Sequence, residues 1–403
     1  MSIRGTAVGR GIRGFRPFLT ACLDFGRRFA NCDKHLFMPI FMDRHDVSDA
    51  VTAETIAHLH QEDLKVQAQF GCRGLTYWFD DKRKTAFCLI EAPHIEAIRE
   101  MHSFAHGDVP HRVIEVDTDL VESFLGRIED PVKPRGAELN VIDDPAFRAI
   151  MVMDVKPAFF PNGDLGLFRA GTQLLMQGVP EVLKAFDGAM VKQSPDLYLI
   201  SFKQVSYAVH AAFELRKSFK DCGEGQRLQV KIGLSTGMPV TEKKLIFEDA
   251  IRLAERMAMA CREDIVVSAE VRELYDGENP APLATRKGIC CLTPADEQFL
   301  TRLMDHAEKC WSDIHLKVDD LNKVVGYSKP QLYRKMIGLT GKSPVTFIKD
   351  YRLNEALSLL NRQMGNVSQI AYESGFSSPS YFTKCFQKRY GQSPTDYLAA
   401  RAG

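Results

Sequence analysis

Short apolar runs and amphipathic stretches alternate along the first third of the chain. Apolar runs at 37–43, 74–79, 85–91 and 112–116 predict strands, and amphipathic stretches at 53–70 and 94–104 predict helices. The resulting order is strand, helix, strand, strand, helix, strand. That order favours a ferredoxin-like α+β sandwich over residues 36–130.

A second region, residues 135–285, combines strands and helices in a different order. Apolar runs at 149–154, 197–202 and 230–235 predict strands, while 206–219 and 248–261 predict helices. Segments rich in proline and glycine at 130–136 and 277–282 mark its two ends. The pattern indicates a second α+β domain.

The last region, residues 295–403, contains one helical pattern written twice. At an offset of 49 residues, Gly326 aligns with Gly375 and Ser328 with Ser377. The offset holds as far as Lys384, and a one-residue slip then aligns 341–344 with 391–394. Each copy reads as a helix, a glycine turn, a capping serine and a second helix. We therefore expect an all-α domain with two helix-turn-helix units in tandem.

The second helix of each copy separates inward-facing from outward-facing positions. Leu332 and Met336 recur at i and i+4, as do Tyr381 and Cys385, so both pairs are expected to face inward. The outward positions carry side chains that hydrogen-bond base edges and phosphates. They are Lys329, Gln331, Arg334, Lys335, Ser378, Ser380, Thr383, Lys384, Gln387 and Lys388. Of these we expect Gln331, Arg334, Lys384 and Gln387 to contact bases.

Charge is distributed unevenly along the chain. From 299 to 403 there are 15 Lys and Arg against 9 Asp and Glu, a net charge of +6, whereas the whole chain has a net charge of 0. A basic module on a neutral protein is typical of a nucleic-acid reader, and the alternative is a helical bundle with a solvated basic surface. Duplication of the turn residues favours the reader.

The C-terminal region closely resembles the DNA-binding domain of AraC/XylS-type transcription regulators. The resemblance rests on residues 370–394 and on the connecting helix 347–360, and it extends over about 299–400. It implies two recognition helices, 329–337 and 379–389, that enter successive major grooves of double-stranded DNA roughly 34 Å apart.

Histidines gather in the first domain. Seven of the eleven lie between residues 45 and 111, and His102 and His106 share a helical face at i and i+4. Imidazole clusters suit nickel, zinc and copper, although scattered histidines are more often surface residues.

The first domain also resembles a small bacterial family of nickel-binding ferredoxin-like domains. The matching segments are 38–45, 60–67, 77–80, 86–93 and 102–107. The resemblance implies that His45, His60, His102 and His106 bind nickel or another transition metal. His58 and His111 are the alternative candidates for ligands.

The middle region resembles the class III nucleotide cyclase domain. The segments that carry the resemblance are 195–202, 230–237, 250–256 and 265–268. In that family two aspartates hold metal ions on the triphosphate and an arginine stabilises the transition state. Asp154, Asp196 and Arg256 stand near those positions, so they would be the remnants of such a site.

Departures from the cyclase pattern favour a domain without catalytic residues. Val155 and Lys156 begin the segment that replaces a phenylalanine-rich stretch, Pro195 replaces a glycine, and Arg252 replaces the ribose-orienting asparagine. We expect a degenerate cyclase fold that serves homodimerisation or the sensing of a ligand. The alternatives are an active nucleotide cyclase with a DNA-binding output, and a domain that binds a nucleotide without turning it over.

The remaining features concern the N-terminal segment of the chain and the cellular compartment in which we expect the protein. Residues 1–35 form a basic leader that we expect to be disordered, or that precedes a natural start at Met38; a DNA-holding arm is the alternative. No apolar run reaches the ~20 residues of a membrane span, and no CxxC pair occurs among the ten cysteines. Together the patterns predict a cytoplasmic, metal-responsive regulator of transcription, with a nucleotide cyclase or nucleotide sensor as the alternative.

Overall fold

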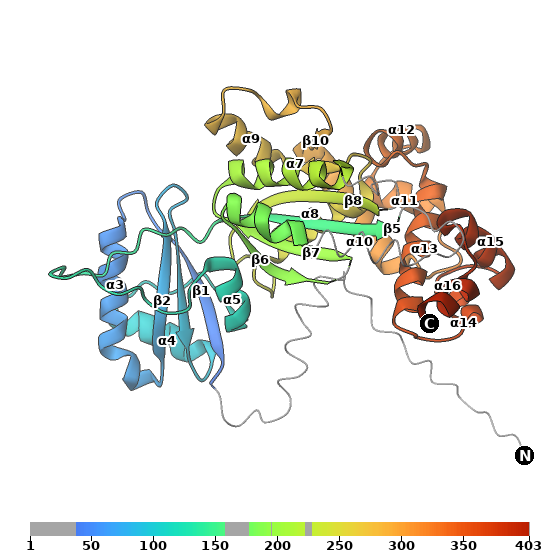
Figure 1. Cartoon of the computed structure of the whole chain (residues 1–403). Helices are drawn as coiled ribbons and strands as arrows, with labels where there is room; N and C mark the ends of the chain where they lie inside the picture. Colours follow the sequence, from blue (N-terminus) through green and yellow to red (C-terminus); the bar gives the residue numbers. More distant parts are fainter. Residues whose placement is uncertain (1–37, 158–176, 195, 222–227, 403) are drawn as a thin grey trace, which may run out of the picture. The chain divides into compact units, whose positions relative to one another are not determined.

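The computed structural model describes residues 38–157, 177–194, 196–221 and 228–402 (Figure 1). The basic leader and Pro195 lie outside the described residues, so the expectations for them stay predictions. Among the described residues the chain divides into two compact units, one that ends at Gln298 and one that begins at Phe299.

The N-terminal domain has the predicted order of elements. Its strands are β1 (Ile40–Asp46), β2 (Arg73–Asp80), β3 (Thr85–Glu91) and β4 (Arg112–Val116). Its helices are α3 (Ala53–Val66), the 3-10 helix η1 (Gln67–Phe70), α4 (Ile95–Ala105) and α5 (Thr118–Leu125). The strands form one antiparallel sheet in the order β2-β3-β1-β4, which confirms the ferredoxin-like α+β prediction.

Helix starts and apolar packing explain why this sequence adopts that domain. The Thr52 side chain accepts a hydrogen bond from Thr55 N and begins α3, and the His94 ring does the same for Ala97 N at the start of α4. Ile56, Ile98 and Met101 are buried in one core with the sheet residues. Buried polar residues of this domain therefore lie among well-packed apolar neighbours.

The middle domain is built on a six-stranded mixed sheet in the order β10-β9-β8-β5-β7-β6. Its strands are β5 (Arg148–Pro157), β6 (Gly188–Gln193), β7 (Leu197–Phe202), β8 (Leu228–Gly237), β9 (Ile265–Val267) and β10 (Ile289–Cys291). The helices α7 (Val205–Asp221), α8 (Glu248–Ala260) and α9 (Ala269–Glu278) and the 3-10 helix η3 (Leu283–Thr285) complete it. The α+β prediction is confirmed, and β10 extends the sheet past residue 285.

Close packing of α8 on the sheet depends on one glycine. A Cβ at Gly233 of β8 would clash with the Ala254 carbonyl oxygen. Gly233 therefore lets the helix backbone approach the strand directly. On this helix Arg256 is buried.

The C-terminal region is helical throughout. Its helices are α10 (Pro294–Cys310), α11 (Val318–Val325), α12 (Lys329–Thr340), α13 (Pro344–Asn361), α14 (Val367–Glu373), α15 (Pro379–Tyr390) and α16 (Pro394–Ala402). The pairs α11–α12 and α14–α15 are the two predicted helix-turn-helix units. Gly326 and Gly375 have φ values of +73° and +72°, and a Cβ at Gly375 would lie 2.8 Å from the Trp311 carbonyl oxygen. Glycine is thus required in the turns, as expected.

The one-residue slip between the two copies lies in the turn, not after the second helix. Ser328 is the N-cap of α12, whereas Ser378 and not Ser377 is the N-cap of α15. The recognition helices therefore correspond at an offset of 50.

This shift corrects the expected inward face of the second copy. Phe382 and Phe386 are fully buried, whereas Tyr381 is 52% exposed and Cys385 is only partly buried. The inward assignment of Tyr381 and Cys385 was wrong because it applied to the helix the offset of 49 that holds only up to the turn, whereas the helices align at an offset of 50.

Candidate functional site

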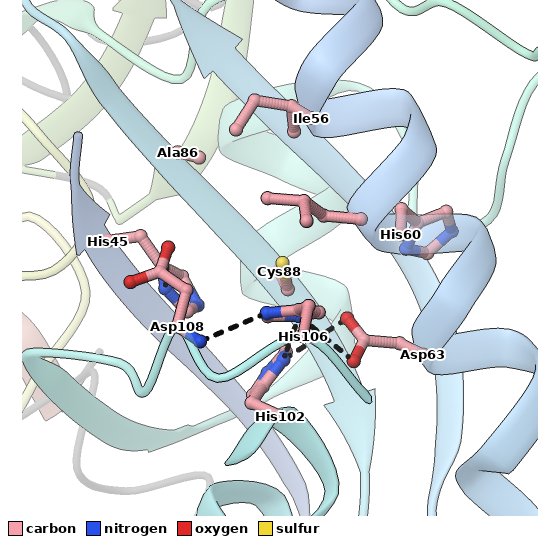
Figure 2. Close-up of a pocket in the computed structure, with 10 residues that line it drawn as sticks. His45, Ile56, His60, Asp63, Ala86, Cys88, His102, His106 and Asp108 are labelled. Atoms are coloured by element: carbon pink, nitrogen blue, oxygen red, sulfur yellow. Dashed lines mark hydrogen bonds and ion pairs between the residues drawn. The ribbon is translucent and has the colours of Figure 1, made fainter. Parts of the chain in front are cut away.

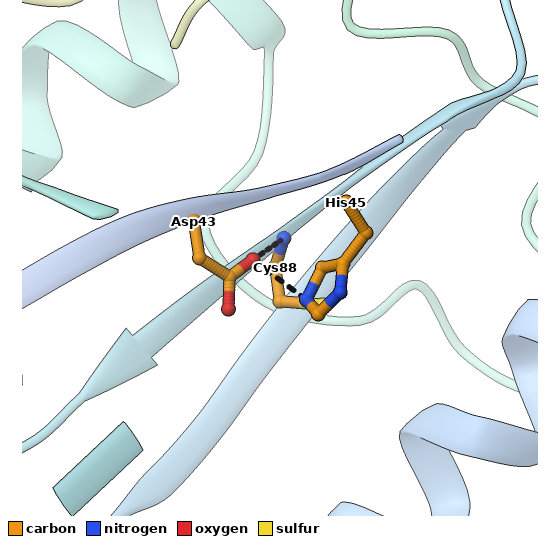
Figure 3. Close-up of side chains that lie close together, drawn as sticks. All are labelled: Asp43, His45 and Cys88. Atoms are coloured by element: carbon orange, nitrogen blue, oxygen red, sulfur yellow. Dashed lines mark hydrogen bonds and ion pairs between the residues drawn. The ribbon is translucent and has the colours of Figure 1, made fainter. Parts of the chain in front are cut away.

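Six polar side chains from four elements meet inside the N-terminal domain; Figure 2 draws all of them except Asp43, which Figure 3 shows. Asp43 and His45 stand two residues apart on β1, so they share a face of the sheet. Asp63 comes from α3, Cys88 from β3, and His102 from α4, which His106 follows as the C-cap residue. The six form two groups of three, Asp43–His45–Cys88 and Asp63–His102–His106.

His102 lies at the centre of the cluster and contacts a carboxylate with each ring nitrogen. Its Nε2 is 3.0 Å from Asp43 Oδ2, and its Nδ1 is 3.1 Å from Asp63 Oδ2. His106 Nε2 lies 3.3 Å from His102 Nδ1 and 3.2 Å from Asp63 Oδ1. Three potential ligand atoms therefore converge between α3 and the end of α4.

The second group lies on the adjacent strands (Figure 3). Asp43 Oδ1 accepts a hydrogen bond of 2.8 Å from the backbone N–H of Cys88 and is 3.6 Å from His45 Nε2. His45 Nδ1 is 3.4 Å from Asp108 Oδ2. Because Asp43 also contacts His102, this carboxylate links the two groups.

Burial and mutual contact set the charges of these side chains. Burial opposes ionisation of Asp43, but the charge of His45 and hydrogen bonds with His102 and His45 outweigh it and hold the carboxyl pKa well below its usual range. Burial likewise opposes the charge of both histidines. The Asp43 carboxylate nevertheless raises the pKa of His45 to about 9, and hydrogen bonds to Asp43 and Asp63 raise the pKa of His102 to about 10. Without an ion, two charged imidazoles thus balance two carboxylates.

The donor set fits a transition metal ion. The side chains line a cavity of about 20 Å³, a volume that holds about one water-sized particle. His45 Nδ1 and Asp63 Oδ1 are buried without a hydrogen-bond partner, since their nearest contacts lack hydrogen-bond geometry. Buried polar atoms of this kind need an explanation, and an ion in the cavity would provide one. Imidazole, carboxylate and thiol groups are ligands of nickel, zinc and related ions.

Three of the four histidines expected as ligands meet in these groups, and His60 does not. His60 lines the same cavity, but its Nε2 is 3.2 Å from Asp130 Oδ2 and its ring packs 5.0 Å from that of Tyr77. Neither group of potential ligand atoms includes it among the described residues. His58 is exposed, and His111 Nδ1 accepts a hydrogen bond from Asp46 N.

Sequence reasoning missed Asp43, Asp63 and Cys88. The two aspartates had a signal in their spacing, because Asp43 is two residues from His45 on a strand and Asp63 is three residues from His60 on a helix. Cys88 stands on a strand of continuous apolar residues, where a cysteine looks like core packing.

The cyclase-like remnants have a different environment. Asp154 is buried on β5, burial raises its pKa, and Lys156 Nζ lies 2.8 Å from its Oδ2. Asp196 is exposed just before β7, where its backbone carbonyl accepts a hydrogen bond from Val155 N and its Oδ1 accepts one from Ser194 Oγ. The two residues are thus neighbours through the backbone, but the cation beside Asp154 is a lysine.

The expected DNA-contacting residues fall into two sets. Several already have partners within the domain. Lys329 Nζ is 2.7 Å from Asp319, Gln331 Oε1 accepts from Ser328 N, Lys335 Nζ lies over the Phe299 ring, and Ser378 Oγ caps α15. Thr383 is partly buried, and the exposed members are Arg334, Ser380, Lys384, Gln387 and Lys388. Tyr333 and Tyr381, both 52% exposed on the same helices, were not expected on this surface.

Two family models match this chain, one in each end region. Residues 321–400 match the helix-turn-helix domain, and residues 41–116 match the family described as nickel responsive protein SCO4226-like. The chain therefore carries a helix-turn-helix domain of the AraC type at its C-terminus and an SCO4226-like domain near its N-terminus, as both resemblances implied.

The curated relatives match through about half of their length or less. Histidine kinase P4 of Formosa agariphila is 35% identical over 106 residues, which are 26% of this chain and 8% of the kinase. The HTH-type transcriptional activator RhaS of Escherichia coli is 33% identical over 144 residues, 32% of this chain and 52% of the activator. This chain thus spans at most about half of either relative.

Solved structures were compared with the whole chain. SCO4226 from Streptomyces coelicolor is 31% identical, covers 19% of this chain and 94% of its own, and has a TM-score of 0.18. The DNA-binding domain of AdpA, solved with a target DNA, is 25% identical, with 27% and 96% coverage and a TM-score of 0.24. A bacterial light-regulated adenylyl cyclase is 13% identical, with 59% and 87% coverage and a TM-score of 0.25. Scores at this level carry no functional information.

Among the described residues, no helix is both long and apolar enough to cross a membrane.

Proposed function

We propose that this protein is a sequence-specific DNA-binding regulator of transcription that responds to a transition metal, nickel in the first instance, bound in its N-terminal domain. The observation that carries the proposal is the pairing of a buried Asp–His–Cys cluster with two capped helix-turn-helix units in one chain. The family models at the two ends support the same pairing.

The correspondence between the recognition helices supports DNA reading. Arg334 stands six residues after the N-cap Ser328, and Lys384 stands six residues after the N-cap Ser378. Both side chains are exposed. A basic residue at the same turn of each helix can contact the same groove feature in two successive major grooves.

The metal part of the proposal rests on the two ligand groups. His45, His102 and His106 supply imidazole nitrogens, while Asp43 and Asp63 supply carboxylates that orient the rings or bind the ion themselves. For the ion to regulate, it must bind the DNA-competent and DNA-incompetent states with different affinity.

The test is metal-dependent DNA binding by the full chain. Operators are first selected from random duplexes, and their affinity is then measured with Ni²⁺, with Zn²⁺ and with a chelator. We expect nickel to change the affinity severalfold and the double variant His102→Ala/His106→Ala to abolish the change. His58→Ala, on the exposed face of α3, is the matched control and should respond like the wild type.

If the protein binds DNA specifically but with the same affinity in the presence of every metal, the proposed metal response is wrong and the proposed DNA binding stands. Among base contacts, Arg334→Ala and Lys384→Ala should each cost about 1–3 kcal/mol and relax specificity at one position. A uniform loss on all sequences would reassign the residue to a phosphate.

A second candidate function is nucleotide turnover or nucleotide sensing by the middle domain. The adjacency of Asp154 and Asp196 favours it, and the lysine at Asp154 opposes a metal-dependent reaction. Product formation from ATP or GTP with Mn²⁺ would establish a cyclase. Thermal stabilisation by nucleotide without product would indicate a sensor, and sedimentation with and without nucleotide would test the proposed homodimer.

A further inference from the structure

We propose that Cys88 is a thiolate ligand of the metal bound in the N-terminal domain, so that the site is a mixed nitrogen, oxygen and sulfur centre. The inference rests on the metal binding proposed above and adds the ligand type that decides which ions the site accepts. Figure 2 shows Cys88 near His45, His102 and His106, and Figure 3 shows it beside Asp43 and His45.

The position of Cys88 places its sulfur among ligand atoms. Its Sγ, one carboxylate oxygen of Asp43 and one ring nitrogen of His45 all lie within 4.8 Å of one another. The residue is buried and lines the cavity together with His45, His102 and His106. Its own backbone N–H donates to Asp43 Oδ1, which fixes the strand against this carboxylate.

The plain alternative is that Cys88 is a small core residue, and Cys72 shows how that case looks. Cys72 is also buried and free in the same domain, but its Sγ faces the Phe70 carbonyl oxygen at 3.7 Å and it joins neither ligand group. Cys88 instead lies beside Asp43 and His45. An apolar packing role does not require neighbours of that kind.

Independent atoms in the same cavity also call for a ligand. The nearly fully buried His45 Nδ1 and Asp63 Oδ1 have no hydrogen-bond partner. In Figure 2 Cys88 is drawn between His45 and Asp63, and all three residues line the cavity.

Burial raises the pKa of the Cys88 thiol well above its usual value, and the negative charges of Asp43 and Asp63 raise it further. The thiol is thus inert without an ion, and a bound cation would deprotonate it.

A sulfur ligand changes the chemical class of the bound ion. Thiolate together with imidazole favours Ni²⁺, Co²⁺, Zn²⁺ or copper over Mg²⁺, Ca²⁺ and Mn²⁺, which prefer oxygen. Cys88 would therefore let the domain discriminate against abundant oxygen-seeking cations.

The experiment is a Co²⁺ titration of the full-length protein, followed by absorption spectroscopy and by calorimetry. Cobalt bound by a thiolate gives sulfur-to-metal charge-transfer absorption in the near ultraviolet. We expect this absorption in the wild type and in Cys72→Ser, and its loss in Cys88→Ser with binding weakened roughly tenfold or more. X-ray absorption at the nickel edge of the wild type should show a sulfur neighbour, a readout that does not depend on the fold of any variant.

Two results would overturn the inference in different ways. Stoichiometric binding with only nitrogen and oxygen neighbours, unchanged in Cys88→Ser, would remove Cys88 from the site and leave the proposed metal-responsive function standing. Absence of any metal binding by the wild type would remove both.

Discussion

Two buried aspartates on β-strands, Asp43 in the N-terminal domain and Asp154 in the middle domain, show how the neighbouring cation decides what a carboxylate can do. Asp43 faces the imidazoles of His45 and His102, whereas Asp154 faces the ammonium of Lys156 at 2.8 Å. An imidazole can give up its proton and bind a metal ion through nitrogen. A lysine ammonium is a compact positive charge that pairs with the carboxylate itself, in the position that a metal ion would otherwise take.

The two regions therefore differ in what they can exchange. In the N-terminal domain the protons of two charged histidines can be exchanged for one divalent ion. In the middle domain the resident ammonium already compensates the carboxylate, so a divalent ion would have to displace a side chain. This difference between Asp43 and Asp154 can be tested by mutation and by metal binding.

The largest contrast is expected from neutralising each aspartate. Asp43→Asn should lower the free energy of unfolding by about 3–5 kcal/mol, because it leaves two buried histidines without their shared carboxylate. Asp154→Asn should change it by about 1 kcal/mol or less, because Lys156 is partly solvated and the ionised form of Asp154 is itself penalised by burial. Chemical denaturation of both variants measures the difference, and equal losses would contradict it.

Nickel affinity should rise steeply with pH. The pKa values of about 9 for His45 and about 10 for His102 keep both rings protonated near neutral pH, so an ion must displace these protons. Between about pH 6 and pH 8 the affinity should increase by roughly tenfold per pH unit for each proton displaced.

The stability of the metal-free protein, unlike its nickel affinity, should fall as the pH rises on the alkaline side. A raised histidine pKa stabilises the fold below the unfolded value of 6.5, and this contribution is lost as pH rises through about 9–10. Calorimetry in buffers of different ionisation enthalpy counts the released protons. An affinity that does not depend on pH would mean that the rings are neutral before binding.

Removing the lysine should make the middle domain resemble the metal site. Lys156→Ala is expected to cost about 1–3 kcal/mol of stability, because Asp154 loses its ion pair. Mn²⁺ should then raise the melting temperature of the variant and leave the wild type unchanged. Lys217→Ala, on the exposed face of α7, is the matched control. No response to Mn²⁺ in the variant would show that Lys156 is not what excludes the ion.

The fold could be predicted from the sequence further than the site. Apolar periodicity gave the order of strands in the N-terminal sheet. In the middle domain it missed β6, whose residues are partly buried or exposed, and β9 and β10, which have three residues each. The glycine turns of both helix-turn-helix units were found because glycine recurs at the same place in both copies, and Gly326 and Gly375 do adopt positive φ values of +73° and +72°. The extra turn residue, Ser377, could not be located, since serines at 377 and 378 can both cap a helix.

Within the candidate site, sequence predicted residues by type and missed those that depend on folding. The resemblance to the nickel-binding family implied His45, His60, His102 and His106 as ligands. Asp43, Asp63 and Cys88 enter the site only because β1, α3 and β3 bring them together. His60, the fourth expected ligand, lines the same cavity but joins neither ligand group, and its Nε2 contacts Asp130, which is 70 residues away in the chain.

The smallest effect should come from His60, and it would sharpen the boundary of the site. His60→Gln keeps a donor for Asp130 and preserves much of the packing beside Tyr77. Nickel affinity should change by less than about threefold, roughly 0.6 kcal/mol, whereas His102→Ala should lose nearly all binding. Calorimetric titration of the two variants provides the comparison. If His60→Gln lost binding as His102→Ala does, the bond to Asp130 would have to break when the ion enters, and His60 would return to the ligand set that its motif position predicted.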